Sequence, residues 1–304
     1  MNVEQYDEMC FDFKVLVDQF QQKYKQIYQS DFDFLKHFEK KLNQSKENKY
    51  LIIYHELQPV GFCFFEKISA FYGALTFFVV QKKWCNLICK VSVEYKYFDD
   101  FLMEIICYEY EKNYRKNFKQ YGLIENFRQR MRLALYEDEY FSEMPTPYFT
   151  KPLCKQDLYI SSKLSFLAHQ VSRDYYMYPG MNDLDNRLQL EQFAFDGLYG
   201  TLNQDASFFI CKQDRILGYC LVVNVDCWGE RQVPWIFDIS VLPEYQGQGI
   251  GRLILHQLIN TCVMQKKTQL GLAVTISNKN AIHLYESVGF QFLSTFYEYI
   301  KKVS

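Results

Sequence analysis

A glycine-rich stretch, 245–252, holds the residues whose types and spacing most directly indicate chemistry. Its sequence is Tyr245-Gln246-Gly247-Gln248-Gly249-Ile250-Gly251-Arg252, between a strand-like apolar pattern and an amphipathic helix pattern. Glycine lets the backbone approach an anion closely, and the unpaired N–H groups in a helix's first turn lie at the positive end of its dipole. The stretch therefore predicts a phosphate site, and we expect the ligand to carry a pyrophosphate.

The elements that position this turn follow from hydrophobic periodicity. A helix is predicted from Ile250, because apolar residues recur there at helical spacing. A second helix, 280–288, is expected to stop at Gly289, since glycine is favoured just after a helix end. The other predicted elements of this half are helices over 162–176 and 184–196, separated by Pro179-Gly180, and strands over 207–211, 218–225, 235–242, 270–276 and 290–300.

The N-terminal half shows a similar order of patterns. The segment Val60-Gly61-Phe62-Cys63 also resembles Leu217-Gly218-Tyr219-Cys220, with a chance match of four residues as the alternative. After Val80 no glycine follows at once, so this half is not expected to bind phosphates. Its predicted elements are helices over 12–28 and 32–42 and strands over 50–55, 59–65 and 74–80.

These patterns predict a mixed α/β fold present as two tandem copies. The copies are expected over 1–145 and 150–304, and the linker near Met144-Pro145-Thr146-Pro147, because paired prolines disrupt both helix and strand. Only the C-terminal copy is expected to hold the phosphate site.

The composition is typical of a globular protein. The 304 residues carry a formal net charge of −2 and are 49% hydrophobic, so no nucleic-acid partner is expected. The basic run 112–119 is interpreted as a solvated helix face, with a local binding role as the alternative. No apolar run reaches the ~20 residues that span a bilayer, so no membrane partner is expected. The ten cysteines contain no CxxC pair, which predicts no metal, no disulfide framework and a cytoplasmic protein. A monomer or homodimer is expected.

Three segments together resemble the GCN5-related N-acetyltransferase (GNAT) superfamily. Residues 246–251 fit its signature of Gln or Arg, two residues, Gly, one residue, then Gly or Ala; 241–245 resembles the lead-in, and 278–290 the second cofactor motif. A P-loop would need Gly-Lys-Ser/Thr, and a Rossmann motif would open a βαβ unit. The resemblance covers the chain from about Thr150 onward, and it implies a mixed sheet that is splayed to admit acetyl-coenzyme A.

The resemblance also implies which residues bind acetyl-CoA. The strand before the turn would pair with the pantetheine through its backbone, as an added strand does, and Gln246 would orient the loop. Arg252 is either a phosphate contact or an ordinary solvated residue, and Asn278 either contacts the cofactor or caps a helix. The implied set is Ile239, Ser240, Val241, Gln246, Gly247, Gln248, Gly249, Ile250, Gly251, Arg252 and Asn278.

Catalysis would need an acid for the departing thiolate and a base for the acceptor amine. Tyr285 matches the family's acid, with a buried core tyrosine as the alternative. Relatives carry a glutamate base at one of two positions, occupied here by Ala273 and Trp235. Asp238 is the remaining acidic group on that strand and is the predicted base, and a water chain is the alternative.

The resulting hypothesis is an acetyl-CoA-dependent N-acetyltransferase that acts on a primary amine of a small molecule or peptide. A non-catalytic, CoA-binding interaction or sensing protein is the alternative. The aromatic segment 175–180 would either shape the acceptor pocket or form a domain interface.

Overall fold

The computed structural model divides the chain into two compact units. Unit 1 comprises Met1–Asn126 with Phe296–Ser304, and unit 2 comprises Phe127–Thr295. The predicted copies 1–145 and 150–304 are corrected accordingly, because residues 128–134 pair with a strand of the C-terminal half. The structure describes residues 2–28, 32–67, 73–94, 102–104, 110–137, 140–142, 144–172, 174–175 and 178–300.

Unit 1 is built on an antiparallel sheet with strand order β1-β2-β3-β4. Rings fill the core that α1 and α2 form with this sheet, and the Phe13 and Tyr50 rings stack with centroids 3.8 Å apart. The elements are β1 (Asn2–Tyr6), α1 (Phe11–Tyr28), α2 (Phe34–Gln44), β2 (Lys49–His55), β3 (Gln58–Lys67), β4 (Gly73–Val79), α3 (Cys85–Glu94), β5 (Leu102–Glu104) and α4 (Glu111–Gln120).

Unit 2 contains a mixed sheet with strand order β13-β6-β12-β11-β10-β9-β7, and β8 pairs with β10. The division between the units falls inside β6 and β13. The elements are β6 (Ile124–Ala134), β7 (Tyr148–Pro152), α5 (Leu158–His169), α7 (Pro179–Asn182), α8 (Leu184–Phe195), β8 (Thr201–Leu202), β9 (Phe208–Lys212), β10 (Arg215–Cys227), β11 (Glu230–Val241), α9 (Ile250–Met264), β12 (Gln269–Thr275), α10 (Lys279–Ser287) and β13 (Gln291–Ile300).

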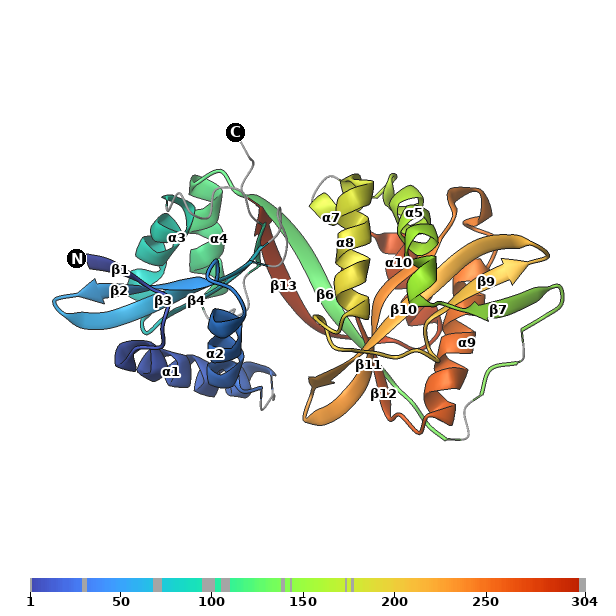
Figure 1. The fold of residues 1–304 in the computed structure, drawn as a ribbon, viewed down its shortest axis with the longest axis horizontal. Coiled ribbons are helices and arrows are strands. Elements are labelled where there is room, and N and C mark those ends of the chain that lie inside the picture. Colours follow the sequence, from blue (N-terminus) through green and yellow to red (C-terminus); the bar gives the residue numbers. More distant parts are fainter. Residues whose placement is uncertain are drawn as a thin grey trace. The chain divides into compact units, whose positions relative to one another are not determined.

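Helices cover both faces of the unit 2 sheet (Figure 1). Successive residues of a strand point to opposite faces, and β10 shows this alternation. Cys220 and Val222 pack in the cluster that contains α9 and α10. Tyr219 and Leu221 pack in the cluster that contains residues of α5 and α8. Both faces of β10 are therefore buried, and the strand forms the middle of the core.

A β-bulge in β11 lies where the pairing of this strand with β12 ends. The ladder with β10 pairs Val222 with Ile236 and Leu221 with Asp238, so Phe237 is an extra residue. Bulges bend a strand and redirect its side chains. The parallel ladder with β12 comprises Trp235 and Ile236 of β11, and it ends where the bulge begins. Beyond this point the β12-side edge of β11 has no strand partner among the described residues.

The two units share a local feature that supports the predicted repeat. In β10 a β-carbon added to Gly218 would lie 2.6 Å from the carbonyl oxygen of Ser240, and in β3 one added to Gly61 would lie 2.5 Å from that of Phe78. Each glycine lies next to a register shift in its own sheet. Only glycine fits such a close approach. The same backbone packing therefore accounts for the glycine that the segments 60–63 and 217–220 share.

Most of the predicted elements and the mixed α/β fold are confirmed. Gly289 has a φ of 99° directly after α10, as expected of a helix stop. The helix predicted over 162–176 is wrong in extent, since α5 ends at His169. Pro179 begins the short helix α7, where proline needs no N–H partner. Tyr148–Pro152, just after the predicted linker, forms β7 and pairs with β9.

Candidate functional site

The glycine turn connects β11 to α9 through backbone conformations that suit glycine. Gly247 has a φ of 74° and Gly249 a φ of 84°, values in the left-handed region that other residues adopt at a cost. The Gln246 side chain donates to the carbonyl oxygen of Val241 at 2.9 Å, and Gln248 donates to that of Glu244 at 2.8 Å. These two amides tie the turn to the end of β11.

Five consecutive N–H groups in this turn are free within the described part of the chain. No described residue accepts a hydrogen bond from the backbone N–H of Gly247, Gln248, Gly249, Ile250 or Gly251. Unpaired N–H groups at the start of a helix form an anion site, because the helix dipole also favours negative charge there. This arrangement fits a pyrophosphate.

Arg252 makes hydrogen bonds within unit 2 through both its backbone and its side chain. Its N–H donates to the carbonyl oxygen of Gly249 at 3.1 Å, inside the first turn of α9. Its guanidinium donates to Ser287 Oγ at 3.0 Å. The N–H of Arg252 is thus already used, and a phosphate contact by its side chain stays a prediction.

The edge of β11 and the start of α10 supply the other predicted cofactor residues. Ile239 and Val241 pack against the cluster around α9, and with Ser240 they lie on the edge that β12 leaves open. Asn278 caps α10 by accepting a hydrogen bond from the N–H of Ala281 at 3.1 Å. Gly251 permits close packing of the two helices, since a β-carbon there would lie 3.0 Å from Leu284 Cδ2.

Tyr285 lies on α10 with its ring in the core and its hydroxyl without a hydrogen-bond partner among the described residues. The side chain is 7% exposed and packs edge-on against Phe290. Burial, and then the charge of Asp238, raise the pKa of its hydroxyl above the ordinary value. Tyr285 is therefore protonated at neutral pH and is available as a proton donor.

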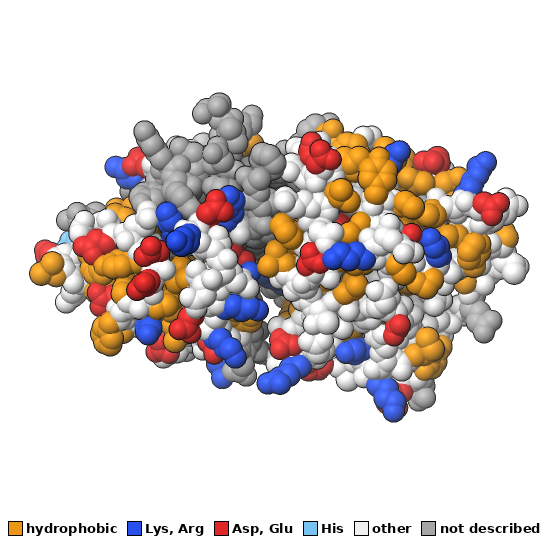
Figure 2. All heavy atoms as spheres, in the orientation of Figure 1, with side chains coloured by type: hydrophobic (Ala, Val, Ile, Leu, Met, Phe, Trp, Pro, Cys, Tyr) orange, Lys and Arg blue, Asp and Glu red, His pale blue; other side chains and the backbone are white. Residues whose placement is uncertain are grey.

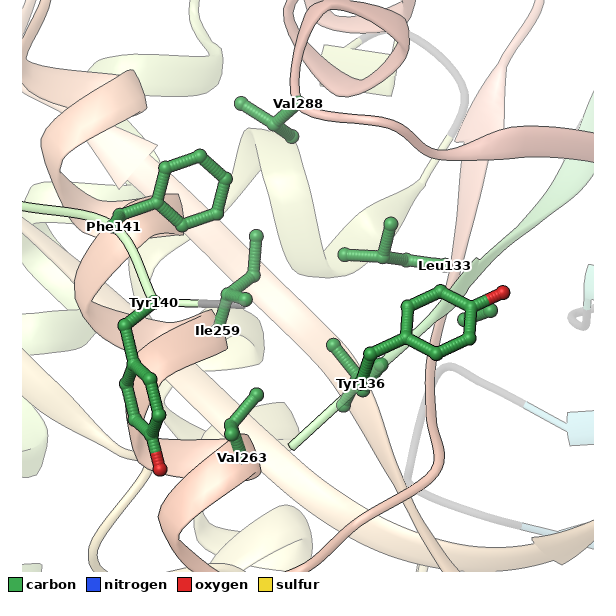
Figure 3. Close-up of a pocket in the computed structure, with 9 residues that line it drawn as sticks. Leu133, Tyr136, Tyr140, Phe141, Ile259, Val263 and Val288 are labelled. Carbon is green, nitrogen blue, oxygen red and sulfur yellow. The ribbon is translucent and has the colours of Figure 1, made fainter. Parts of the chain in front are cut away.

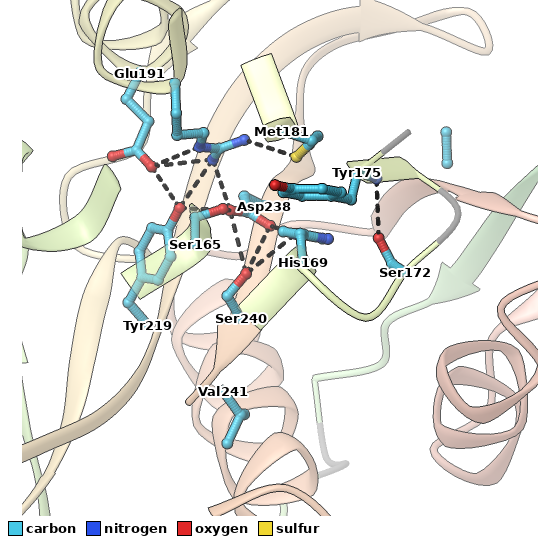
Figure 4. Close-up of polar contacts among 12 residues, drawn as sticks. Ser165, His169, Ser172, Tyr175, Met181, Glu191, Tyr219, Asp238, Ser240 and Val241 are labelled. Atoms are coloured by element: carbon cyan, nitrogen blue, oxygen red, sulfur yellow. Dashed lines mark hydrogen bonds and ion pairs between the residues drawn. The ribbon is translucent and has the colours of Figure 1, made fainter. Parts of the chain in front are cut away.

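Asp238 lies in a buried polar cluster that joins four elements (Figure 4). Its Oδ2 accepts hydrogen bonds from Arg187 at 2.6 Å, Tyr219 at 2.5 Å and Ser165 at 2.7 Å. Arg187 is 1% exposed and also donates to Glu191 Oε1 at 3.0 Å. The cluster places a guanidinium against two carboxylates inside the core.

The geometry reassigns Asp238 from the predicted base to a fixed counter-charge. Burial acts to raise its pKa, but the Arg187 guanidinium and the hydrogen bond from His169 hold the pKa of this carboxyl well below its usual range. A carboxylate that is so weakly basic gains little as a general base, since the best base has a pKa near the working pH. Three donors also occupy Oδ2. Asp238 is thus ionised and held in place.

His169 is the polar residue of this cluster that reaches the surface. It is the last residue of α5, and its side chain is 18% exposed. Its Nε2 lies 3.3 Å from Asp238 Oδ1 and 3.3 Å from Ser240 Oγ. His169, Arg187 and Glu191 were not predicted from the sequence as site residues. The i,i+4 spacing of the last two was the available signal, but such a pair is also typical of a solvated helix face.

The remaining predicted features lie around the cluster or away from it. In the aromatic segment 175–180, Tyr175 lies 6.2 Å from Phe166 between ring centroids, and the Arg128 guanidinium lies 5.9 Å from the Tyr178 ring. Tyr176 and Met177 lie outside the described residues. An apolar pocket of about 380 Å³ lies at the C-terminal part of α9, lined by Ile259 and by aromatic residues that follow β6 (Figure 3). It is thus at the opposite end of α9 from the glycine turn.

Acidic and basic side chains of the described residues are interspersed on the face in view (Figure 2). Within the described ranges, no group of three or more His, Cys, Asp or Glu side chains is arranged to hold a metal ion. No described helix is long and apolar enough to cross a bilayer.

Comparison with known proteins finds similarity to the family that the sequence motifs resemble. The model of the Acetyltransferase (GNAT) family matches residues 168–290. The ribosomal protein bS18-alanine N-acetyltransferase of Escherichia coli is 47% identical over 55 residues, which are 18% of this chain and 37% of that protein. The chain thus spans little more than a third of that relative.

Two solved structures resemble most of the chain in fold. A GCN5-related N-acetyltransferase from Sphaerobacter thermophilus has a TM-score of 0.66 at 12% identity, with 98% of this chain and 95% of that chain covered. A tandem GNAT protein from the clavulanic acid biosynthesis pathway has a TM-score of 0.54 at 10% identity, covering 83% of this chain and 82% of that one. At such identities the likeness concerns the fold alone, and it extends to a second copy in the N-terminal part.

Proposed function

The chain belongs to the GNAT superfamily of acetyltransferases, and on that premise we propose that it transfers an acetyl group from acetyl-CoA directly to a primary amine. The observation that carries the proposal is the run of five free N–H groups at 247–251. They lie directly after the strand whose edge β12 leaves open. A ligand with a pyrophosphate next to an amide-bearing arm matches both features.

Residues of unit 2 would hold the two parts of this ligand. The N–H groups of Gly247 to Gly251 would receive the pyrophosphate, and the backbone of Ile239, Ser240 and Val241 would pair with the amides of the arm. Acetyl-CoA supplies an activated acyl group as a thioester. Gln246 supports this arrangement because its amide fixes the turn to Val241.

Tyr285 would act as the acid. Its hydroxyl is protonated, as its raised pKa indicates, and no described residue holds the proton in a hydrogen bond. A thiol has an ordinary pKa of ~8.5, which is below that of a tyrosine, so a proton does not pass spontaneously from the tyrosine to a thiolate. The transfer is feasible if it is concerted with the departure of the sulfur, or if the tyrosine receives a new proton from the acceptor nitrogen. The acceptor is an amine of a small molecule or of a peptide.

The test measures thiol release from acetyl-CoA with a panel of amines, polyamines, amino acids and peptides. We expect turnover in the wild type and a loss of kcat by about 10²–10⁴-fold in Tyr285→Phe, as is usual for removal of a general acid. Tyr148→Phe is the matched control, because Tyr148 is a half-buried tyrosine on β7 of the same unit, and its kcat should not change.

Thermal unfolding separates binding from catalysis. Acetyl-CoA should raise the melting temperature of the wild type and of Tyr285→Phe by equal amounts, because a ligand that binds only the folded state stabilises it by mass action. A rise without turnover for any acceptor would favour a non-catalytic CoA-binding protein. No rise at any acetyl-CoA concentration would refute the CoA site itself.

A further inference from the structure

We infer that His169 accepts the proton from the acceptor amine and that Asp238 is the positioning residue that orients its imidazole. This inference rests on the proposed function and names the base of the same site. The geometry that carries it is the contact of one imidazole nitrogen with a buried, fixed carboxylate, while the other nitrogen has no partner among the described residues.

The hydrogen bonds to Asp238 determine which nitrogen is free. An ionised carboxylate only accepts hydrogen bonds, so the 3.3 Å contact with Asp238 Oδ1 favours the tautomer that carries its hydrogen on Nε2, with Ser240 Oγ as the second neighbour of that nitrogen. In the neutral ring the other nitrogen, Nδ1, then keeps its lone pair. Figure 4 shows His169 with one nitrogen toward Asp238 and Ser240 and the other directed away from the cluster. Nδ1 is thus placed to take a proton.

The rest of the cluster keeps the Asp238 carboxylate from turning. Arg187, Tyr219 and Ser165 all donate to Oδ2, while Oδ1 faces the imidazole. Ser240 Oγ lies 3.1 Å from Oδ1 and 3.3 Å from Oδ2. Such an outer carboxylate fixes the tautomer and the ring orientation of a histidine. The titratable or charged groups that surround His169 from the packed elements are Asp238 on β11, Arg187 and Glu191 on α8, and Tyr219 on β10.

His169 also lies where the two substrates would meet. It ends α5 and contacts Ser240, a residue on the open edge of β11 that is proposed to pair with the cofactor. Tyr285 belongs to the buried cluster against which Ile239 and Val241, the neighbours of Ser240 on β11, are packed. The proposed base and the proposed acid are thus both assigned to the site around β11.

The proton balance of the transfer is complete with these two residues. The acceptor ammonium gives one proton to Nδ1 of His169, and the neutral nitrogen attacks the thioester carbon. A C–N bond forms and the C–S bond breaks with its electron pair on sulfur. Tyr285 protonates the sulfur and regains a proton from the acylated nitrogen, and His169 loses its proton to solvent.

The first test reads the tautomer, without any ligand. In the full chain labelled with ¹⁵N-histidine, the five histidines give few signals, and His169→Gln assigns the one of interest. At a pH where the ring is neutral, we expect the hydrogen on Nε2 and a bare Nδ1. A hydrogen on Nδ1 would overturn the inference, whatever the enzyme's activity.

The second test compares kinetics of His169→Gln and His283→Gln. His283 is an exposed histidine on α10, so its variant is the matched control and should keep wild-type rates. For His169→Gln we expect kcat/KM to fall by about 10²–10⁴-fold at neutral pH and to recover in part as rising pH supplies neutral amine. The rise in melting temperature with acetyl-CoA should stay.

Chemical rescue distinguishes a lost base from a disturbed fold. Added imidazole should restore part of the rate of His169→Ala and leave the wild type unaffected. A His169→Gln enzyme within about threefold of the wild type, with the same pH profile, would overturn the inference while the proposed function stands. Absence of turnover in the wild type would instead refute the transferase function, and the proposed proton transfer with it.

Discussion

Replacing Arg187 by methionine would remove the guanidinium from the buried cluster while keeping a side chain of similar length. Arg187 is 1% exposed, and one of its nitrogens donates to Asp238 at 2.6 Å and to Glu191 at 3.0 Å. Both carboxylates would remain in the core without this partner. Removing one member of a buried ion pair costs about 3–5 kcal/mol, and we expect a loss of that size from the free energy of unfolding of unit 2.

Fluorescence can follow this unit separately within the full chain. Trp228 and Trp235 lie in unit 2 and Trp84 in unit 1, so a Trp84→Phe background makes the signal specific. The expected loss corresponds to a fall in melting temperature of roughly 6–20 °C for a domain of this size. Arg215→Met is the control, because Arg215 is exposed, and it should change stability by less than about 0.5 kcal/mol.

The pH dependence gives the sharper test. In the wild type the pKa of Asp238 is depressed, so its contribution to stability is complete above the unfolded pKa of ~3.9 and is lost as pH falls through the folded value. In Arg187→Met, burial without the guanidinium should raise the pKa of Asp238 above its unfolded value. The pKa of Glu191, which burial already raises in the wild type, should rise further. Protonation then favours the folded state of the variant. The difference in free energy of unfolding between the wild type and Arg187→Met should therefore shrink as pH falls from 7.5 to 5.5. A difference that is constant over this range, or below about 1 kcal/mol, would refute the electrostatic argument.

Two further predictions use glycine positions. Gly247→Val should abolish the rise in melting temperature with acetyl-CoA. Gly229→Val is the control and should keep this rise. Both glycines have φ near 75° and open space around an added β-carbon, so valine should cause a similar backbone strain of about 1–3 kcal/mol at each position. Equal ligand responses in calorimetry would contradict the phosphate site. Gly218→Ala and Gly61→Ala should each lose about 1–3 kcal/mol, measured by urea unfolding, because both β-carbons would contact a facing carbonyl oxygen. Tolerance of alanine at only one of them would contradict the structural repeat.

Local signals made most of the fold predictable. The start of α9 at Ile250 and the stop at Gly289 depend on residues close in sequence, and both predictions are confirmed. The domain bounds depend on pairing between distant strands. β6 aligns Ala134 with Gln269 of β12, and nothing in the local sequence of 127–134 indicates that partner. The prolines near 145–147 indicated a linker because they restrict the local backbone. They carry no information about which distant strands pair.

The candidate site was predictable only in part. The glycine turn has a motif, so its residues could be named from the sequence. His169 and Arg187 have none, because a histidine at a helix end and an arginine on a helix face are ordinary surface residues until the fold buries them. Asp238 was found as the acidic residue of its strand, but its role depended on donors from α5, α8 and β10, which no pattern within β11 could reveal.

The two units provide an internal comparison for the buried cluster. When Gly218 is aligned with Gly61, the sheet registers place Tyr219 opposite Ser240 and Leu221 opposite Asp238 in unit 2. The same positions in unit 1 are Phe62 opposite Phe78, and Phe64 opposite Thr76. Unit 1 thus has phenylalanine in place of Tyr219 and Ser240 and a neutral threonine in place of Asp238.

This comparison separates what the fold requires from what the site requires. Well-packed apolar residues are often as stabilising as a buried ion pair of similar volume, or more so, and unit 1 fills these positions largely with rings. The fold therefore does not need a carboxylate and a guanidinium in its core. Unit 1 also passes from β4 to α3 through Lys82–Trp84 with no glycine turn. Unit 1 has its own ion pair of Lys41 with Glu66, but the described part of unit 1 has neither the glycine turn nor a charged residue that corresponds to Asp238. Unit 2 has both, as expected if one reaction uses both.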